Sequence, residues 1–431
     1  MRRRTFVKST VPIAAIPFLR DCFSFHSLNS IFSSADSDTD DRVLVLVQLE
    51  GGNDGINTVI PLDQYSQLTD ARKNILIPDK SVLPLKNTSI TGLHPSMPQM
   101  QNLFNNNQLS IIQGVGYPDT NLSHFRSTDI WLTGSDAKTI VNNGWIGRFL
   151  SQKYPGYPKG YPNKTAPAPP AIQVGSVMST ALQGPTVGLG TALISTSSFY
   201  DLTMGAYEPA PETPAGYQLN FMRMLANETQ QYTAVLKSAA RAQSNLSKLY
   251  PTQGTNQLAD QLKIVAQLIG GGLKTKVYMV NLGGFDTHGG QVDSSNPMTG
   301  KHSELLAMVS NAIAAFQDDI TLMGKQDKVL GMTFSEFGRR IKSNASHGTD
   351  HGTSGPIFLF GSKVKPGIIG TNPVIPDKIT VDDNLPLQHD FRSVYASVLK
   401  DWFGVSNADL EKTLPGISPS LNLFNFSTSR S

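Results

Sequence analysis

"KVYMVNLGGFDTHGGQ", residues 276–291, begins as a run of apolar residues, passes two glycines and ends on Asp286 and His288. The apolar run is typical of a β-strand that is buried on both faces. Ligands of open α/β sheets bind beyond the carboxyl ends of the strands, so a carboxylate and an imidazole at this point are candidates for a functional site. Taken alone, an Asp-x-His after a strand is more often an ordinary turn. The interpretation therefore depends on the residues that come directly after the other strands.

Four other runs have the same character: "RVLVLVQL" (residues 42–49), "QLSIIQGVG" (108–116), "DKVLGMTF" (327–334) and "GPIFLFG" (355–361). Apolar residues at helical spacing occupy residues 217–248, 256–269, 302–324 and 390–404. Strands that alternate with helices favour a mostly parallel sheet covered on both faces. We therefore predict an α/β fold, a three-layer sandwich with a mostly parallel central sheet.

The domain organisation follows from length and composition. A chain of 431 residues, 39% of them hydrophobic, is long enough for one large domain. Residues 23–41 are rich in Ser and Asp and predict a linker, and residues 42–431 are predicted to form a single domain. Its middle part, about residues 151–216, is crowded with Pro, Gly, Tyr and Ser and shows little apolar periodicity. We interpret this part as an irregular insertion.

The N-terminus has the pattern of an export signal. Arg3 and Arg4, with Phe6 and Lys8, precede an apolar run over residues 11–19. Residues 1–22 therefore resemble a twin-arginine signal peptide, and a disordered basic tail is the alternative. The run is too short to span a bilayer, and no later segment is long enough, so we expect no transmembrane helix in the mature chain. The protein is predicted to be exported, to the periplasm, the cell surface or the medium.

Cys22 is the only cysteine, which excludes an intramolecular disulfide and a thiolate metal site. Its place after the apolar run raises the alternative of lipidation, although the preceding Arg20 and Asp21 fit such a cleavage site badly. The formal charge of +3 also depends on this region, because residues 1–22 hold five basic residues and one acidic residue. The remaining chain has 31 basic and 32 acidic residues, a balance that excludes a nucleic-acid partner.

Polar residues come after each of the first four strands in chain order. They are Glu50, Asn53 and Asp54; Ser123, His124 and Arg126; Asp286 and His288; and Glu336, Arg339, His347, Asp350 and His351, with His389 at the start of the last helical segment. Glycines flank most of these groups and let the backbone approach a ligand closely. Carboxylates and imidazoles together suit Zn²⁺, Mn²⁺ or Fe, with Ca²⁺ or Mg²⁺ if oxygen ligands dominate. The sequence predicts a divalent-metal site, with Zn or Mn favoured.

At this point the motifs become recognisable. "VQLEGGNDGINTVIP", "SHFRSTDIWLTG", "GGFDTH", "SEFGRRIKSNASHGTDHG" and "DFRSVYASVLKDWFG", in this order, resemble the exported bacterial family called domain of unknown function 1501. The resemblance covers about residues 42–405. The family looks like a remote branch of the alkaline phosphatase and sulfatase superfamily, which implies an alkaline phosphatase-like fold with a metal site at the strand ends.

The resemblance also implies roles for individual residues. It makes Asp54 (or Glu50), Asp286, His288, Asp350 and His351 the metal ligands and Ser123 the hydroxyl nucleophile. Further ligand candidates are Asn53, His124, Glu336, His347 and His389. Arg126 or Arg339 would bind the anion of the substrate. Ser123 lacks the signature of a sulfatase nucleophile that is oxidised to formylglycine, so that kind of sulfatase is not expected.

Two functions remain open from the sequence. The first is an exported metal-dependent hydrolase of phosphate or related esters, with a small anionic ester as substrate and either a hydroxyl or an activated water as nucleophile. The second is a non-catalytic binding or assembly protein that keeps the fold with a degenerate metal site and contacts a partner in the cell envelope. An accessory role in redox chemistry is a further alternative.

Overall fold

The computed structural model describes residues 41–194, 213, 232–419 and 421–426. The predicted signal peptide, all of the predicted linker except Asp41, and most of residues 195–216 of the predicted insertion lie outside the described residues. The domain boundaries therefore stay predictions. Among the described residues, no helix combines the length and the apolar character needed to cross a bilayer.

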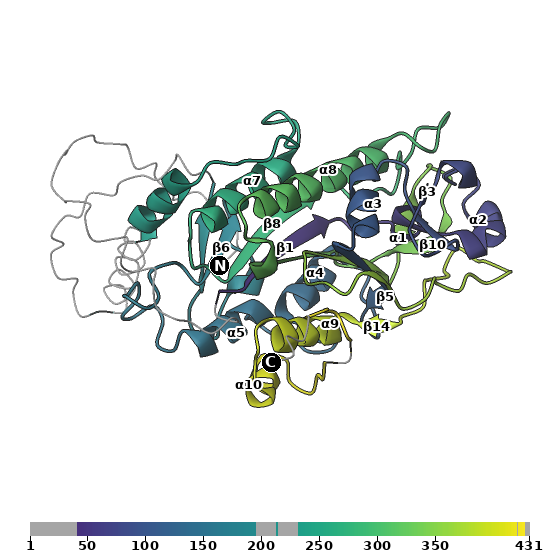
Figure 1. Cartoon of the computed structure of the whole chain (residues 1–431). Coiled ribbons are helices and arrows are strands. Elements are labelled where there is room, and N and C mark those ends of the chain that lie inside the picture. Colours follow the sequence, from purple (N-terminus) through teal and green to yellow (C-terminus); the bar gives the residue numbers. More distant parts are fainter. Residues whose placement is uncertain (1–40, 195–212, 214–231, 420, 427–431) are drawn as a thin grey trace. The chain divides into compact units, whose positions relative to one another are not determined.

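A nine-stranded sheet forms the centre of the domain (Figure 1). Its strands, in spatial order, are β13 (Gly367–Ile369), β5 (Leu109–Gly116), β12 (Gly355–Phe360), β9 (Val329–Phe334), β1 (Val43–Glu50), β8 (Val277–Gly283), β6 (Ala171–Val174) and β7 (Gly190–Leu193), with β14 (His389–Asp390) beside β5. Only β12 runs antiparallel to its neighbours. The prediction of an α/β fold with a mostly parallel sheet is confirmed.

Strand β1 shows why these runs become central strands. Its residues alternate between two hydrophobic cores, with Val45 and Val47 on one face and Leu44 and Leu46 on the other. All four are at most 1% exposed. A strand buried on both faces has no polar side, which is why its sequence is nearly continuous in β-branched residues and leucine.

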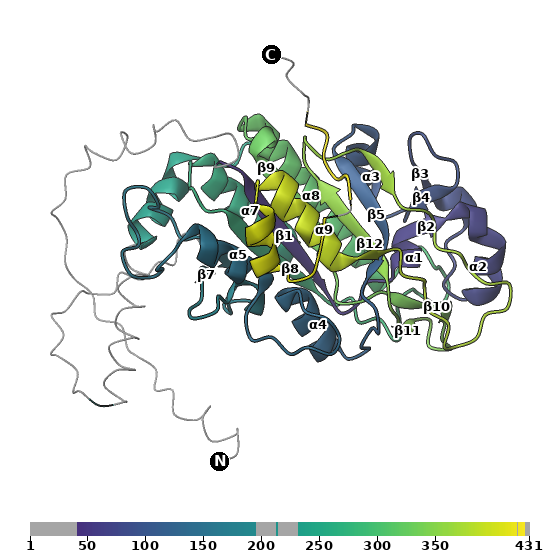
Figure 2. The ribbon, with the colours of Figure 1, turned by 90° about the horizontal axis from the view of Figure 1, so that it is seen from below.

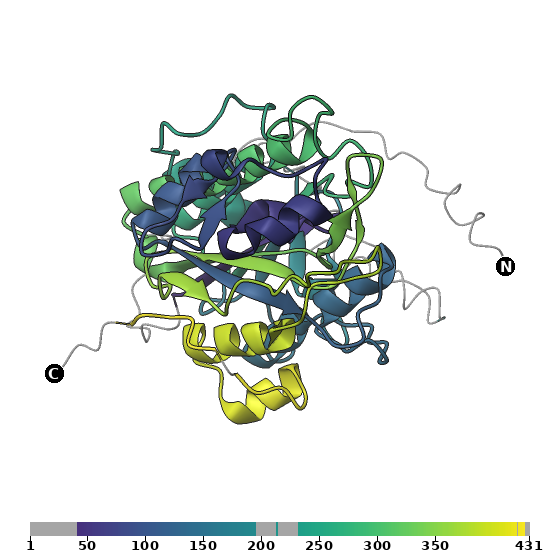
Figure 3. The same ribbon diagram turned by 90° about the vertical axis from the view of Figure 1, so that its right-hand side faces the viewer.

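Helices cover both faces of the sheet and make the structure three-layered (Figures 1, 2 and 3). One core contains residues of α3 (Pro98–Asn105), α7 (Gln257–Gly270) and α8 (Lys301–Leu322) and of a helical segment at residues 232–242. The other contains residues of α4 (His124–Thr133), α5 (Trp145–Lys153), α9 (Phe391–Ser397), the π-helical η6 (Val398–Trp402) and α10 (Asn407–Thr413). The helices expected over residues 256–269, 302–324 and 390–404 are confirmed by α7, α8 and α9 with η6.

Smaller elements complete the domain. A three-stranded sheet joins β2 (Val59–Pro61), β4 (Thr91–Leu93) and β3 (Leu83–Pro84), and β10 (Arg339–Ser343) pairs with β11 (Thr349–His351). Short helical turns are α1 (Gly55–Thr58), α2 (Tyr65–Ala71), η2 (Leu62–Gln64), η3 (Asp79–Ser81), η4 (Thr180–Leu182) and η5 (Gln326–Lys328). Strands β6 and β7, which the sequence did not predict, lie within residues 151–216 and extend the central sheet.

Candidate metal centre

The loops that carry the predicted site meet at one edge of the sheet. Strand β1 is parallel to β8 and β9, with Glu50 opposite Gly283 and Gln48 opposite Phe334, so the three strands end together. Asp286 comes after β8 at this edge, and Glu336 comes after β9. His124 begins helix α4 after β5, and His351 ends strand β11.

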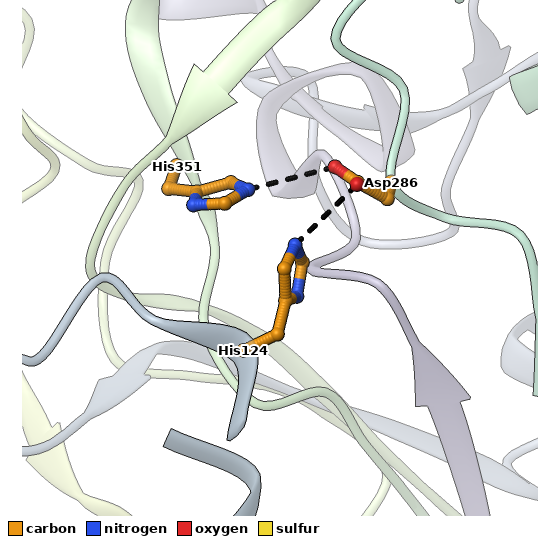
Figure 4. Close-up of side chains that lie close together, drawn as sticks. All are labelled: His124, Asp286 and His351. Carbon is orange, nitrogen blue, oxygen red and sulfur yellow. Dashed lines mark ion pairs between the residues drawn. The ribbon is translucent and has the colours of Figure 1, made fainter. Parts of the chain in front are cut away.

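Three side chains from these loops converge (Figure 4). His124, Asp286 and His351 each offer one possible ligand atom, and these atoms lie within 4.8 Å of one another. The Nε2 atoms of His124 and His351 are each 3.5 Å from a carboxylate oxygen of Asp286. His288 extends the cluster, because its Nε2 atom is 2.8 Å from Nε2 of His351 and 3.3 Å from Oδ1 of Asp286.

The opposite ring nitrogen of each histidine is held by an acceptor. Nδ1 of His351 lies 2.7 Å from the carbonyl oxygen of Leu122, and Nδ1 of His288 lies 3.0 Å from Oδ1 of Asp350. Nδ1 of His124 lies 2.8 Å from Oε1 of Glu336. Metal-binding histidines in proteins have this second contact, which fixes the tautomer and the direction of the ring.

The tautomers follow from these contacts. A carbonyl oxygen can only accept a hydrogen bond, so His351 carries its proton on Nδ1 and directs the lone pair of Nε2 into the cluster. The carboxylates of Glu336 and Asp350 likewise hold Nδ1 of His124 and His288. The Nε2 atoms of His288 and His351 lie 2.8 Å apart, and Nε2 of His124 is buried without a hydrogen-bond partner among the described residues. Three converging imidazole nitrogens and a carboxylate are the donor set of a divalent metal such as zinc.

The carboxylate of Asp286 is held in its charged form. Burial alone would raise its pKa, but the hydrogen bond and charge of Arg339, with the nearby His124 and His288, lower it. Nη2 of Arg339 donates to Oδ1 of Asp286 at 2.7 Å, and the Arg339 side chain is fully buried while that of Asp286 is 47% exposed. Asp286 is therefore an ionised oxygen donor at a solvent-facing site.

Gly51 allows the backbone at Asp286 to pack closely against the turn after β1. Gly51 has φ +118°, and a Cβ atom there would lie 2.3 Å from the amide nitrogen of Asp286. The amide of Gly51 also donates to Oε1 of Glu336 at 2.9 Å. The glycine after β1 thus lets two of the site loops pack against the β1 turn.

Comparison with known proteins places the chain in a family. The family described as "Protein of unknown function (DUF1501)" matches residues 41–413, almost all of the described domain. The chain is a member of DUF1501. This confirms the family that the motifs indicated. None of the curated proteins is significantly similar to it in sequence.

Solved structures show weaker similarities to the DUF1501 chain. It is similar to a protein in the alkaline phosphatase superfamily from Vibrio parahaemolyticus, with 10% identity and a TM-score of 0.39 over 84% of this chain and 66% of that one. It is also similar to the phosphonate monoester hydrolase SpPMH from Silicibacter pomeroyi (12%, 0.36, 88% and 78%) and to the PsFucS1 sulfatase from Pseudoalteromonas sp. (12%, 0.35, 85% and 68%). Identities and TM-scores this low carry no information about the activity of the DUF1501 chain.

Asp54 of the DUF1501 chain lies behind the cluster rather than in it. It is fully buried, and its Oδ2 atom accepts from Arg72 and from Gln291, each at 2.6 Å. Burial would raise the pKa of Asp54, but the charges of Arg72 and His302 and the hydrogen bonds lower it. The neighbouring Asn53 is also buried and accepts from Nε2 of His302 at 3.0 Å. These residues form the support of the site loops.

The other predicted ligands take different places in the DUF1501 chain. Asp350 is 49% exposed, accepts from Nδ1 of His288 and from Asn344, and so orients a histidine. Glu50 accepts from Asn281 at the end of β1. Within the described part of the chain, no hydrogen bond or ion pair joins the side chains of His347 or His389 to the cluster. The Nε2 atom of His389 is buried without a hydrogen-bond partner among the described residues.

The residues predicted to act on the substrate are also located. Ser123 is exposed at the N-cap of α4, directly before His124. Arg126 binds Asp129 and the backbone oxygens of residues 136, 137 and 139, while Arg339 binds Asp286 and four backbone oxygens. Both guanidinium groups are therefore engaged inside the protein. The contribution of the Leu122 carbonyl was not predicted, since no sequence pattern marks a single backbone oxygen.

Proposed function

We propose that this protein is a metal-dependent hydrolase of phosphate or related esters. The observation that carries the proposal is the convergence of three histidine Nε2 atoms and the Asp286 carboxylate, with each opposite Nδ1 held by an acceptor. The Nε2 atoms of His288 and His351 lie 2.8 Å apart, and Nε2 of His288 is 3.3 Å from Oδ1 of Asp286. Imidazole nitrogens and a carboxylate gathered this closely are a donor set that a divalent ion could use.

In this proposal His124, Asp286 and His351 hold the ion. Three protein ligands are typical of catalytic sites, which keep a position for substrate or water. A divalent ion bound there would supply a Lewis acid that polarises the ester oxygen and offsets its developing negative charge. The ion would also be the main positive charge facing the substrate, because Arg126 and Arg339 are engaged elsewhere.

His288 is assigned to proton transfer. Its ring is 46% exposed, Asp350 holds its Nδ1 atom, and its Nε2 atom faces the cluster. This arrangement allows Nε2 to take a proton from the attacking group. The attacking oxygen, from water or from Ser123, forms a bond to phosphorus, and the bond to the ester oxygen breaks. The alcohol leaves with one proton, and a covalent Ser123 ester would need a second attack by water.

A binding or assembly role is the second candidate. It is favoured by the engagement of both arginines that were predicted to bind the substrate anion. In that case the same metal would hold together the loops that carry the cluster residues, without turnover.

We also propose export by the twin-arginine route, because residues 1–22 resemble such a signal peptide. A fusion of residues 1–40 to a reporter protein tests this proposal, with Arg3→Lys/Arg4→Lys as the control.

Hydrolysis assays on zinc-loaded, manganese-loaded and chelator-stripped protein test the main proposal. The substrates are p-nitrophenyl phosphate, bis(p-nitrophenyl) phosphate and p-nitrophenyl sulfate. We expect turnover of at least one of them that depends on metal and falls by about 10²–10⁴-fold in His288→Asn. His347→Asn is a matched control, because His347 lies outside the cluster and its φ of +54° suits asparagine. Metal-bound protein that hydrolyses none of the three favours the binding role.

A further inference from the structure

A cavity lies away from the metal centre, beside the edge strand β13. Its volume is about 630 Å³, within the range of roughly 300–1,000 Å³ that is usual for small-molecule sites. Strand β13 pairs with Ser110–Ile112, the N-terminal half of β5, whereas His124 comes after the C-terminal end of β5. None of the cluster residues lines the cavity, so it is a separate site.

The charge of the cavity lining is balanced. Asp63 and Lys86 are the only charged residues among the described residues that line it. An anionic ligand would face the Asp63 carboxylate, and a cationic one would face the Lys86 ammonium group. A neutral ligand avoids both repulsions.

The polar groups that face the cavity include several with no internal partner. Asn87 and Asn107 are exposed, and among the described residues neither their side-chain amides nor the Oδ2 atom of Asp63 has a hydrogen-bond partner within the protein. The other oxygen of Asp63 accepts from Nδ2 of Asn372 at 2.6 Å. Asn372 is only 8% exposed and is itself fixed by Thr91. The carboxylate is therefore held in place with one oxygen free.

Apolar groups form the rest of the wall. Phe104 is buried, and Ile368 lies on the edge strand. Ile90 and Val374 are 49% and 69% exposed, which leaves two large aliphatic side chains in water at the same cavity. A purely apolar ligand would cover these groups but would desolvate the free amides, at a cost of about 1–3 kcal/mol for each buried group left unpaired.

We propose that this cavity binds a neutral, hydroxyl-rich ligand with an apolar face, such as one or two units of a saccharide. Hydroxyl groups can donate to Asp63 and can both donate to and accept from the amides of Asn87 and Asn107. The C–H face of a sugar ring can cover Ile90 and Val374. The site holds its ligand independently of the metal centre and of any hydrolysis there.

Calorimetric titration of the full chain with maltohexaose, cellohexaose, chitohexaose and xylohexaose tests the proposal. We expect at least one of these neutral oligosaccharides to bind. The double variant Asn87→Gly/Asn107→Gly removes both amides and should weaken binding at least about fivefold, because each net hydrogen bond contributes roughly 0.5–1.5 kcal/mol. Both residues have positive φ, +66° and +61°, so glycine preserves the backbone.

Two controls make the test decisive. Asp119→Gly replaces another residue of positive φ, +55°, that does not line the cavity, and it should bind as the wild type does. Asp286→Ala, in the metal centre, should also leave saccharide binding unchanged. The proposal is wrong if none of the four oligosaccharides binds, or if the double variant binds as tightly as Asp119→Gly. Loss of binding in Asp286→Ala alone would also overturn it.

Discussion

Oε1 of Glu336 lies 2.8 Å from Nδ1 of His124 and 2.9 Å from the amide nitrogen of Gly51, so one buried carboxylate joins a candidate metal ligand to the turn after β1. The Glu336 side chain is only 4% exposed. Glu336 holds the His124 ring through Nδ1 of that ring, while Nε2 of His124 points to Asp286. Glu336 is therefore a positioning residue.

Removal of the Glu336 carboxylate should loosen His124. We expect Glu336→Ala to lower zinc affinity by about 10–100-fold, the usual effect of losing such a partner. Glu336→Gln keeps an oxygen that can accept from Nδ1 and should retain most of the affinity. Competition with a zinc-binding dye measures both. Equal affinities in Glu336→Ala and the wild type would contradict this role.

His288 should separate metal binding from turnover. With His124, Asp286 and His351 as the ligands, His288→Asn should still bind zinc within about tenfold of the wild type but lose about 10²–10⁴-fold in hydrolysis. Dye competition and an esterase assay on the same sample give the two numbers. Loss of stoichiometric zinc in His288→Asn would instead make His288 an essential ligand.

Asp54 should matter for folding rather than for the metal. Its ion pair with Arg72 is fully buried, so Asp54→Asn leaves the guanidinium without a compensating charge, at a cost of about 3–5 kcal/mol in unfolding free energy. Urea denaturation measures the loss, and Asp54→Asn/Arg72→Met should lose less than the sum of the single variants. Folded Asp54→Asn that binds no zinc would show that Asp54 is a ligand after all.

Gly51 should not tolerate a side chain. Its φ of +118° is unfavourable for alanine, and the added Cβ would lie 2.3 Å from the Asp286 nitrogen. We expect Gly51→Ala to lower the unfolding free energy by more than about 1 kcal/mol and to weaken zinc binding as Asp286 moves. Gly290→Ala is the control, since it has φ +61° but open space around its Cβ position. Equal zinc affinity in the two variants would contradict a role of the Gly51–Asp286 contact in placing Asp286.

Two buried histidines should make stability depend on pH. Burial lowers the pKa of His94 to about 3 and that of His302 to about 4, from 6.5. As the pH falls, these histidines are protonated in the unfolded chain before they are protonated in the folded one. Their contribution to the unfolding free energy is therefore fully present above pH 6.5 and decreases as the pH falls toward 4. Each histidine contributes a slope of about 1.4 kcal/mol per pH unit in that range. Denaturation of chelator-stripped protein at pH 7 and pH 5 measures the loss.

His302→Gln isolates one of these contributions. Its unfolding free energy should fall less between pH 7 and pH 5 than that of the wild type, because glutamine does not titrate. The chelator removes the separate pH dependence of metal binding. An identical fall in the two proteins would show that His302 is protonated in the folded state as well.

The sequence predicted the long strands because each is buried on both faces, as β1 shows. It did not predict β6 and β7, which have four residues each and lie among prolines and glycines, where no periodicity can develop. The direction of β12 is not encoded in its composition either, because an antiparallel strand inside a covered sheet is as apolar as its parallel neighbours.

The meeting of the strand-end loops at one edge of the sheet was predictable, but the contacts of their side chains were not. The parallel strands β8 and β9 end together and bring the loops of Asp286 and Glu336 to one edge, whereas His351 reaches that edge through the β10–β11 pair. The sequence shows a carboxylate after β1 but not that Arg72, 18 residues later, turns Asp54 inward. Likewise, His124 is one of several further candidates in the sequence, and only its contacts with Glu336 and Asp286 distinguish it from the others. Such contacts depend on tertiary packing.

The central claim is that His124, Asp286 and His351 hold a divalent metal ion. Metal analysis by mass spectrometry of protein purified without chelators, followed by zinc titration of the stripped protein, tests it most directly. We predict about one divalent ion per chain in the wild type, with loss of the ion in His124→Ala, Asp286→Ala and His351→Ala that remain folded by circular dichroism. A folded wild-type protein that contains no metal and takes up none on titration would contradict the account.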